Sequence, residues 1–230
     1  MWCCSEPWRR ERCGCCGAHS RLWRWAAVDP SGQRLGARPG RDPTAVRIPG
    51  LRSLGHADRV VYRTVGAAGG PTTASPLVAL PTNDQSDLRV VLWLHGTTVY
   101  RGDVASMKAE STDRAVALLL ASAGGAVSAP DCIGLGEGPG THPYGHPGAT
   151  LSASLDALRA ARDVARQQGR TIDERVQISG FSQGGPAATM VGRAVQEGAD
   201  PDFSLGGLTP IGGPFDLSGF EAAAANDDNL

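Results

Sequence analysis

The sequence predicts an α/β fold in which a mostly parallel sheet carries helices on both faces. Three observations support this prediction. Candidate antiparallel strands come first, strand and helix candidates then alternate, and 230 residues suffice for a substantial core. The strongest strand candidate, 88–94, reads Leu-Arg-Val-Val-Leu-Trp-Leu. It is nearly continuously apolar, as expected of a central strand that is buried on both faces.

The remaining elements follow from the hydrophobic period and from turn-forming residues. A polar loop at 83–87 precedes the central strand, and the helix candidate at 151–168 has apolar residues at helical spacing before Gly169. The expected strands are 58–63, with 74–80 as its antiparallel partner, 88–94, 125–129, a segment that starts at 175, and 205–211. The expected helices are 113–123, 151–168 and 184–196.

Residues 1–44 differ in composition from residues 45–230, which we expect to hold the folded domain. Five of the six cysteines lie in this N-terminal segment, among many arginines and without a regular hydrophobic period. We therefore expect a disordered extension that is rich in Cys, Trp and Arg. Its Cys13-Gly-Cys15-Cys16 run lacks the paired C-x₂-C spacing of structural zinc sites, so we predict no metal and no other cofactor.

Charge and hydropathy argue against several classes of partner. The net charge of −1 and the pI near 6.5 give no electrostatic reason to expect binding to nucleic acid or to an anionic membrane. No run of about 20 apolar residues is present, so no transmembrane segment is expected. Charged residues at 9–12 interrupt the apolar stretch that a secretory signal needs. The compartment and the oligomeric state stay open.

A glycine-rich segment at 134–140 suggests a dinucleotide-binding loop at first sight. Its spacing is wrong, because the third glycine of G-x-G-x-x-G would fall on Pro139. The sequence therefore gives no support for a nucleotide cofactor.

The segment Gly180-Phe-Ser-Gln-Gly184 fits the G-x-S-x-G pattern of a nucleophile elbow, which is a sharp turn between a strand and a helix. A serine hydroxyl is a weak nucleophile, so it needs a strained and accessible turn, a base and nearby N–H donors. Gly180 and Gly184 suit such a turn because it leaves no room for a Cβ atom. Ser182 is the candidate nucleophile, and the N–H of Gln183 is a candidate oxyanion donor. The alternative is a glycine-rich turn with an incidental serine.

A second group of candidates, His95-Gly96-Thr97-Thr98, follows the central strand, where an open α/β sheet forms its active-site crevice. The loop after this strand supplies the second oxyanion N–H in hydrolases of this architecture. Gly96 would let the backbone approach the substrate, so Thr97 is the predicted donor, ahead of Thr98. We expect His95 to order the loop and not to act as the base.

Four motifs occur in a characteristic order. They are His-Gly-Thr at 95–97, Ala-Pro-Asp-Cys-Ile-Gly-Leu-Gly at 129–136, Thr-His-Pro-Tyr at 141–144 and Gly-Phe-Ser-Gln-Gly-Gly at 180–185. Together they resemble the α/β-hydrolase superfamily, and over 58–217 the chain is similar to bacterial secretory-lipase-like serine hydrolases. The resemblance implies an α/β-hydrolase fold, a small-molecule ester or lipid substrate, and hydrogen bonds to Asp131 that tie down its loop. Cys132 stands where such proteins usually have tyrosine.

No histidine follows Ser182, although an α/β-hydrolase triad runs in the order Ser, acid, His. The resemblance implies that the acid, the histidine and the last strands lie beyond Leu230. Asp216 could serve as the acid in some variants, but an acid has no role without a base. We therefore expect a hydrolase fold that lacks its last strands, an exposed sheet edge, and little activity of this chain alone.

These features predict a carboxylic ester hydrolase, lipase-like or esterase-like, with an incomplete active site. An acyl peptidase or an acyltransferase on the same fold is the nearest alternative, because the elbow does not encode the leaving group. The other alternative is a non-catalytic binding or interaction protein that kept the fold and lost the triad.

Overall fold

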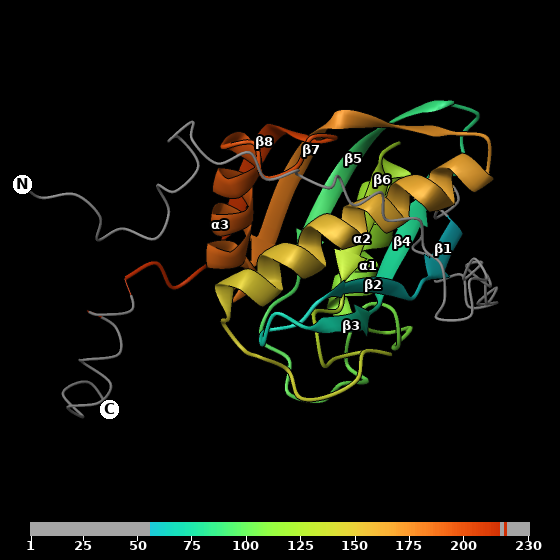
Figure 1. Cartoon of the computed structure of the whole chain (residues 1–230). Helices are drawn as coiled ribbons and strands as arrows, with labels where there is room; N and C mark the ends of the chain where they lie inside the picture. The colour runs from blue at the N-terminus through green and yellow to red at the C-terminus, as the bar shows by residue number, and fades with distance from the viewer. Residues whose placement is uncertain (1–55, 217–218, 220–230) are drawn as a thin grey trace, which may run out of the picture. The chain divides into compact units, whose positions relative to one another are not determined.

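Six strands form one mixed sheet at the centre of the structure. The computed structural model of the protein describes residues 56–216 and residue 219. Within this part the strand order is β1-β4-β6-β5-β7-β8 (Figure 1). The strands are β1 His56–Arg59, β4 Pro76–Leu80, β5 Asp87–Leu94, β6 Ala126–Pro130, β7 Thr171–Phe181 and β8 Ser204–Ile211. The pairs β6–β5, β5–β7 and β7–β8 are parallel. The pairs β1–β4 and β4–β6 are antiparallel. The predicted α/β class is confirmed.

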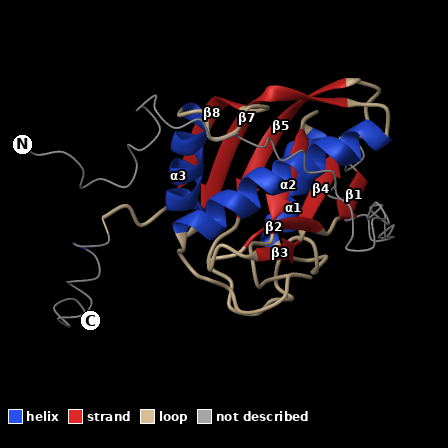
Figure 2. Cartoon of the chain, viewed as in Figure 1, coloured by secondary structure: helices blue, strands red, loops and turns tan. Residues whose placement is uncertain are grey.

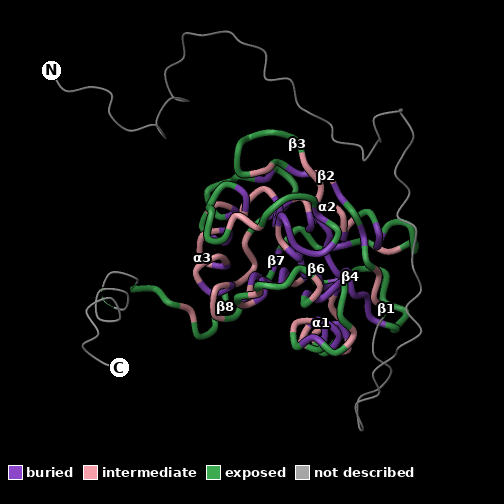
Figure 3. Tube along the Cα trace, turned by 90° about the horizontal axis from the view of Figure 1, so that it is seen from below, coloured by how far each residue is buried: buried purple, intermediate pink, exposed green. Residues whose placement is uncertain are grey.

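Three helices cover the two faces of this sheet. In Figure 1, α2 (Pro147–Gln167) and α3 (Gly184–Gln196) lie in front of the sheet, and α1 (Thr112–Ser122) lies behind it. Figure 3, seen from below, separates these layers and shows buried residues concentrated between them. The prediction of helices on both faces is therefore confirmed.

The central strand β5 supplies both halves of the core. Its residues Leu88, Val90, Leu92 and Leu94 are buried in the cluster that includes α2 and α3. Trp93 faces the other way into the cluster of α1, where its Nε1–H donates to Asp113 Oδ1 at 2.8 Å. A strand that is apolar on both sides is stabilised only between two layers, which explains the apolar run that only Arg89 interrupts.

Capping side chains fix the starts of α1 and α2, whereas α3 begins without a side-chain cap. Ser111 accepts a hydrogen bond from the N–H of Arg114 at the start of α1. His146 caps α2 in the same way, because its Nδ1 accepts from the N–H of Ala149 at 3.2 Å, and Pro147 occupies the first helical position. The prediction that this helix begins at 151 is wrong by four residues, since its first turn has no apolar period.

The first predicted hairpin is also wrong in part. β1 does pair with β4, but the predicted strand at 58–63 divides, and β2 (Tyr62–Val65) pairs with β3 (Pro71–Ala74) in a separate two-stranded sheet. The buried hydroxyl of Tyr62 explains the departure, because it donates to the carbonyl of Ala153 on α2 at 2.9 Å. That bond carries the chain away from the main sheet and onto the helix.

The long loops that follow β5 and β6 gather at one edge of the sheet, drawn in tan below it in Figure 2. The carboxyl ends of parallel strands meet at this edge, which is where ligands bind in open α/β sheets. None of the described helices is both long and apolar enough to cross a membrane. The predicted extension at 1–44, its cysteines and the boundary to 45 lie outside the described residues.

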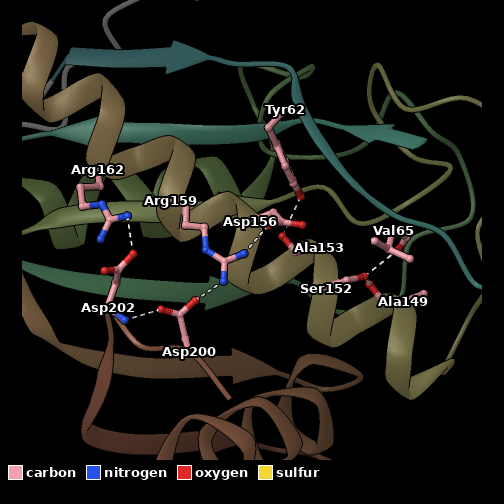
Figure 4. A network of polar contacts seen from close by, with 10 residues as sticks. All are labelled: Tyr62, Val65, Ala149, Ser152, Ala153, Asp156, Arg159, Arg162, Asp200 and Asp202. Atoms are coloured by element: carbon pink, nitrogen blue, oxygen red, sulfur yellow. Dashed lines mark hydrogen bonds and ion pairs between the residues drawn. The ribbon is translucent and has the colours of Figure 1, made fainter. Parts of the chain in front are cut away.

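Ion pairs join α2 to the segment between α3 and β8 (Figure 4). Arg159 contacts both Asp156 and the buried carboxylate of Asp200, and Arg162 binds Asp202 at 2.8 Å. The Oδ1 atom of Asp200 also accepts the N–H of Asp202 at 2.8 Å. A buried carboxylate that holds a helix and a loop together stabilises the fold only while each of its partners stays in place.

Replacement of this carboxylate tests that account. We expect Asp200→Ala to lower the free energy of unfolding by about 1–3 kcal/mol, because it leaves the Nη2 group of Arg159 and the N–H of Asp202 without their acceptor. Urea denaturation measures the change. Glu197→Ala removes an exposed ion pair with Arg193 and serves as the control, with stability expected to stay nearly unchanged. Equal effects of the two substitutions would contradict the assignment.

Candidate active site

Ser182 lies in the turn between β7 and α3, so the strand–turn–helix setting of the elbow is confirmed. Its φ of 52° is in the left-handed region that residues other than glycine rarely adopt. The turn is held by the Ser182 N–H, which donates to Ile211 at the end of β8, and by the Gly185 N–H, which donates to Ser182, both at 2.9 Å. Backbone strain of this kind is typical of functional sites.

The two elbow glycines are required by close backbone contacts. A Cβ on Gly184 would lie 2.1 Å from the carbonyl oxygen of Leu94 at the end of β5. A Cβ on Gly180 would lie 2.2 Å from the carbonyl oxygen of Gly184. The elbow can therefore pack onto the central strand only if both positions lack a side chain.

The loop after β5 reaches the nucleophile candidate. A Cβ on Gly96 would lie 3.6 Å from Ser182 Cβ and 3.3 Å from the ring of Phe181, so the two predicted constellations are brought together. Across residues 56–216, neither the Thr97 N–H nor the Gln183 N–H donates a hydrogen bond. Both predicted oxyanion donors are thus unengaged. The side-chain oxygen of Gln183 is buried and has no hydrogen-bond partner among the described residues.

His95 is buried beneath this loop and faces two carbonyl oxygens. Its Nδ1 lies 2.6 Å from the Gly96 oxygen, and its Nε2 lies 3.2 Å from the Asp131 oxygen. Two acceptors favour the doubly protonated ring. Burial opposes that charge, but Cys132 and the Gly96 carbonyl outweigh it and raise the pKa of His95 to about 10. An imidazolium that donates on both sides cannot accept the proton of a serine, so His95 orders the loop.

Asp131 joins the loops that follow three strands. Its buried carboxylate accepts the hydroxyl of Ser75 at 2.5 Å, the N–H of Ser106 at 3.2 Å and the hydroxyl of Ser106. Burial raises the pKa of Asp131 to about 6, although these hydrogen bonds act in the opposite direction. The sequence did not predict the roles of Ser75 and Ser106, because single serines in loops form no recognisable pattern.

The segment after Asp131 is also held by close contacts and hydrogen bonds. Gly136 has a φ of 57°, and a Cβ there would lie 2.4 Å from both Asp131 Oδ2 and Ser75 Oγ. The guanidinium of Arg101 donates to the carbonyls of Gly136 and Gly138. Cys132, with a φ of 68°, is a partly buried free thiol. This glycine-rich segment is a fixed wall of the site.

Two of the other described histidines, His142 and His146, have partners away from Ser182, and the third, His56, lies exposed in the edge strand β1. His142 Nδ1 lies 2.9 Å from the Ile133 oxygen, and burial lowers the pKa of His142, so its ring is neutral near pH 7. His146 caps α2. Asp216 accepts a hydrogen bond from Gly219 in an exposed segment. In the part of the chain that the structure describes, the Ser182 hydroxyl has no hydrogen-bond partner, and no cluster of His, Cys, Asp or Glu could hold a metal ion.

Comparison with known proteins decides the family. A model of the secretory lipase family matches residues 101–228, more than half of the chain. The chain belongs to the secretory lipase family. In this family member the matched region begins at Arg101 and contains the wall after β6, the elbow and β8.

Solved structures share its fold. The rice cell wall degrading esterase LipA from Xanthomonas oryzae is 28% identical, with a TM-score of 0.61 over 71% of this chain and 44% of LipA. A Legionella pneumophila protein described as a hydrolase gives 28% identity and a TM-score of 0.61 over 70% of this chain and 44% of its own. This secretory lipase family chain thus spans less than half the length of either protein. No match was found among curated proteins.

Substitution of an elbow glycine tests the packing. We expect Gly184→Ala to destabilise the fold by about 3 kcal/mol or more, because the new Cβ meets backbone atoms that cannot move aside. Gly148→Ala is the control. It adds a Cβ in the first turn of α2 with no contact under 3.5 Å, so its effect should stay within about 1 kcal/mol. Thermal unfolding compares the two, and a stable Gly184→Ala protein would contradict the packing argument.

The raised pKa of Asp131 predicts a pH dependence of stability. A carboxyl with a folded pKa of about 6 and an unfolded value near 4 stabilises the fold below pH 4, and this contribution is lost as pH rises through 6. Relative to Asp131→Asn, the wild type should therefore lose on the order of 2–3 kcal/mol between pH 4 and pH 7. Urea denaturation across this range measures the loss.

The control for this prediction is Asp163→Asn, at an exposed carboxyl of α2. It should keep the pH profile of the wild type. If Asp131→Asn and the wild type lost stability in parallel between pH 4 and pH 7, Asp131 would not be the titrating group.

Proposed function

We propose that this protein acts as a carboxylic ester hydrolase, lipase-like or esterase-like, with Ser182 as its nucleophile. The observation that carries the proposal is the position of Ser182, which sits in a left-handed turn at the end of β7, directly against Gly96 of the loop after β5. Family membership supports the reaction class. The similarity to an esterase that has also been crystallised with a ligand bound agrees with an ester substrate.

The proposed reaction is acyl transfer through the serine hydroxyl. Ser182 Oγ forms a bond to the ester carbonyl carbon, its proton passes to a base, and the carbonyl π electrons move onto oxygen. The N–H groups of Thr97 and Gln183, which have no acceptor among the described residues, would hold that oxyanion. Collapse of the intermediate expels the alcohol with a proton, and water then releases the acid from Ser182 by the same steps.

The base is the part of the site that the described histidines do not supply. His95 and His142 bind carbonyl oxygens, His146 caps a helix, His56 lies in the edge strand β1, and none of them hydrogen-bonds to Ser182. We therefore propose that the described residues do not supply the base of a triad and that this chain alone hydrolyses esters slowly. The same observation favours a second candidate function, in which the protein binds esters without cleaving them.

A fluorophosphonate probe tests the nucleophile. We expect slow labelling of the full chain at Ser182, located by peptide mass spectrometry, and an acceleration when imidazole is added as a base. Ser182→Ala should abolish the label. Ser179→Ala should keep it, because the Ser179 hydroxyl is already bound to another acceptor, the Thr209 oxygen of β8.

Each outcome decides between the candidates. Absence of label in folded protein, even with imidazole, would exclude Ser182 as nucleophile and favour the binding protein. Rapid labelling without imidazole would show that a base is already present, and the proposal of an incomplete triad would be wrong.

A further inference from the structure

Backbone contacts alone hold the nucleophile candidate and one of the two proposed oxyanion donors. The Ser182 N–H donates to the Ile211 carbonyl, and the Gly185 N–H donates to the Ser182 carbonyl, both at 2.9 Å. Gln183 begins α3 without a side-chain capping bond, so its own N–H lies at the positive end of the helix dipole. Negative charge that develops on a carbonyl bonded to Ser182 would therefore be stabilised even without a base.

The second proposed donor is positioned by a histidine that cannot itself act as the base. Both ring nitrogens of His95 lie at carbonyl oxygens, 2.6 Å from that of Gly96 and 3.2 Å from that of Asp131. These contacts fix Gly96, which lies against Ser182 and precedes Thr97. A ring that donates on both sides has no lone pair for a further proton. Among the described residues, the geometry for binding an oxyanion is thus present without a base beside the serine.

The two halves of ester hydrolysis depend unequally on such a base. In acylation by the ester of a phenol, the phenolate leaves without taking up a proton, so only the serine proton must be passed to solvent. In deacylation, water must lose a proton and the serine oxygen must gain one. A positioned acid–base group typically accelerates proton transfer by about 10²–10⁴. Without it, release of the acyl group is slowed more than its capture from a phenol ester.

We propose that this chain is a single-turnover acyl acceptor for esters of phenols, in which the acyl group persists on Ser182. The bond from Ser182 Oγ to the acyl carbon forms, the bond from that carbon to the phenol oxygen breaks, and the phenolate leaves with the electron pair. The inference rests on the proposed ester hydrolase function. It names the substrate class and the step at which the reaction of this chain stops.

The persistent acyl group gives the chain a second activity, acyl transfer to strong nucleophiles. Hydroxylamine attacks a carbonyl carbon without a base, because its nitrogen is already a strong nucleophile. The bond from the acyl carbon to Ser182 Oγ then breaks, a nitrogen proton passes to that oxygen, and the acyl group leaves as a hydroxamic acid. Water is a far weaker nucleophile and needs the base that the described residues do not provide.

A matched pair of esters tests the dependence on the leaving group. 4-Nitrophenyl acetate releases a phenolate, whereas 4-nitrobenzyl acetate carries the same aromatic ring but releases an alkoxide. With the full chain, we expect the first ester to give a burst of about one nitrophenolate per protein. The turnover that follows should be slower than the burst by about 10²-fold or more. The benzyl ester should give no measurable acetylation of Ser182.

Peptide mass spectrometry locates the acetyl group. It separates acetyl-Ser182 from acetylation of Lys108, the only lysine of the sequence, which forms an exposed ion pair with Asp103. Ser182→Ala should lose the burst, whereas Ser179→Ala should keep it, because the Ser179 hydroxyl is bound to the Thr209 oxygen. Hydroxylamine should release acetohydroxamic acid from the acetylated chain, and a second burst should follow once the hydroxylamine is removed.

Continued turnover without accumulation of acetyl-Ser182, or equal acetylation by the two esters, would overturn the inference. Fluorophosphonate labelling of the same preparation separates this result from failure of the proposed function. A Ser182 that takes the fluorophosphonate label but forms no persistent acetyl adduct refutes only the single-turnover inference. A Ser182 that takes neither group in folded protein, even with imidazole added, refutes the proposed nucleophile as well.

Discussion

Contact between backbones at the end of β5 is the constraint on which the rest of the structure depends. The Leu94 carbonyl lies so close to the elbow that neither Gly180 nor Gly184 has room for a side chain. That contact turns β7 directly into α3 and leaves Ser182 in a left-handed conformation. It also places Gly96 against the serine. Backbone atoms cannot adopt alternative rotamers, so a site built from such contacts is held more rigidly than one built from side chains alone.

A buried carboxylate extends this rigidity to the neighbouring loops. The Asp131 carboxylate accepts hydrogen bonds from Ser75 and Ser106, and the Asp131 backbone carbonyl faces His95. The His95 ring then fixes the loop that carries Thr97. A protein interior tolerates such a carboxylate because every oxygen has a donor. The loops at the carboxyl edge are therefore positioned by polar contacts, whereas the sheet behind them is held by apolar packing.

The sequence allowed prediction where one local rule decides the structure. The apolar run at 88–94 identified β5, and the glycines of the elbow identified the turn at Ser182, because steric exclusion leaves few residue choices. The prediction failed where the structure depends on a contact with a residue far away in the sequence. Tyr62 leaves the main sheet for a carbonyl on α2, and Ser106 reaches Asp131 from a loop without any period. Histidine is a rare cap, so His146 gave no signal for the start of α2. The roles of Ser182 and Thr97 remain predictions.

The parallel pairing of β5 with β7 has a consequence for how the protein folds. Leu94 meets Gly180 only after a helix, a strand and a second helix have been traversed in the sequence. Contacts of such high contact order form slowly, since the entropy of closing the loop is lost before the contact stabilises anything. We therefore expect helices α1 and α2 to form early from local interactions, and the turn at Ser182 and its facing loop to come together late. On that expectation, the reactivity proposed for Ser182 would report on completed folding more directly than helix content does.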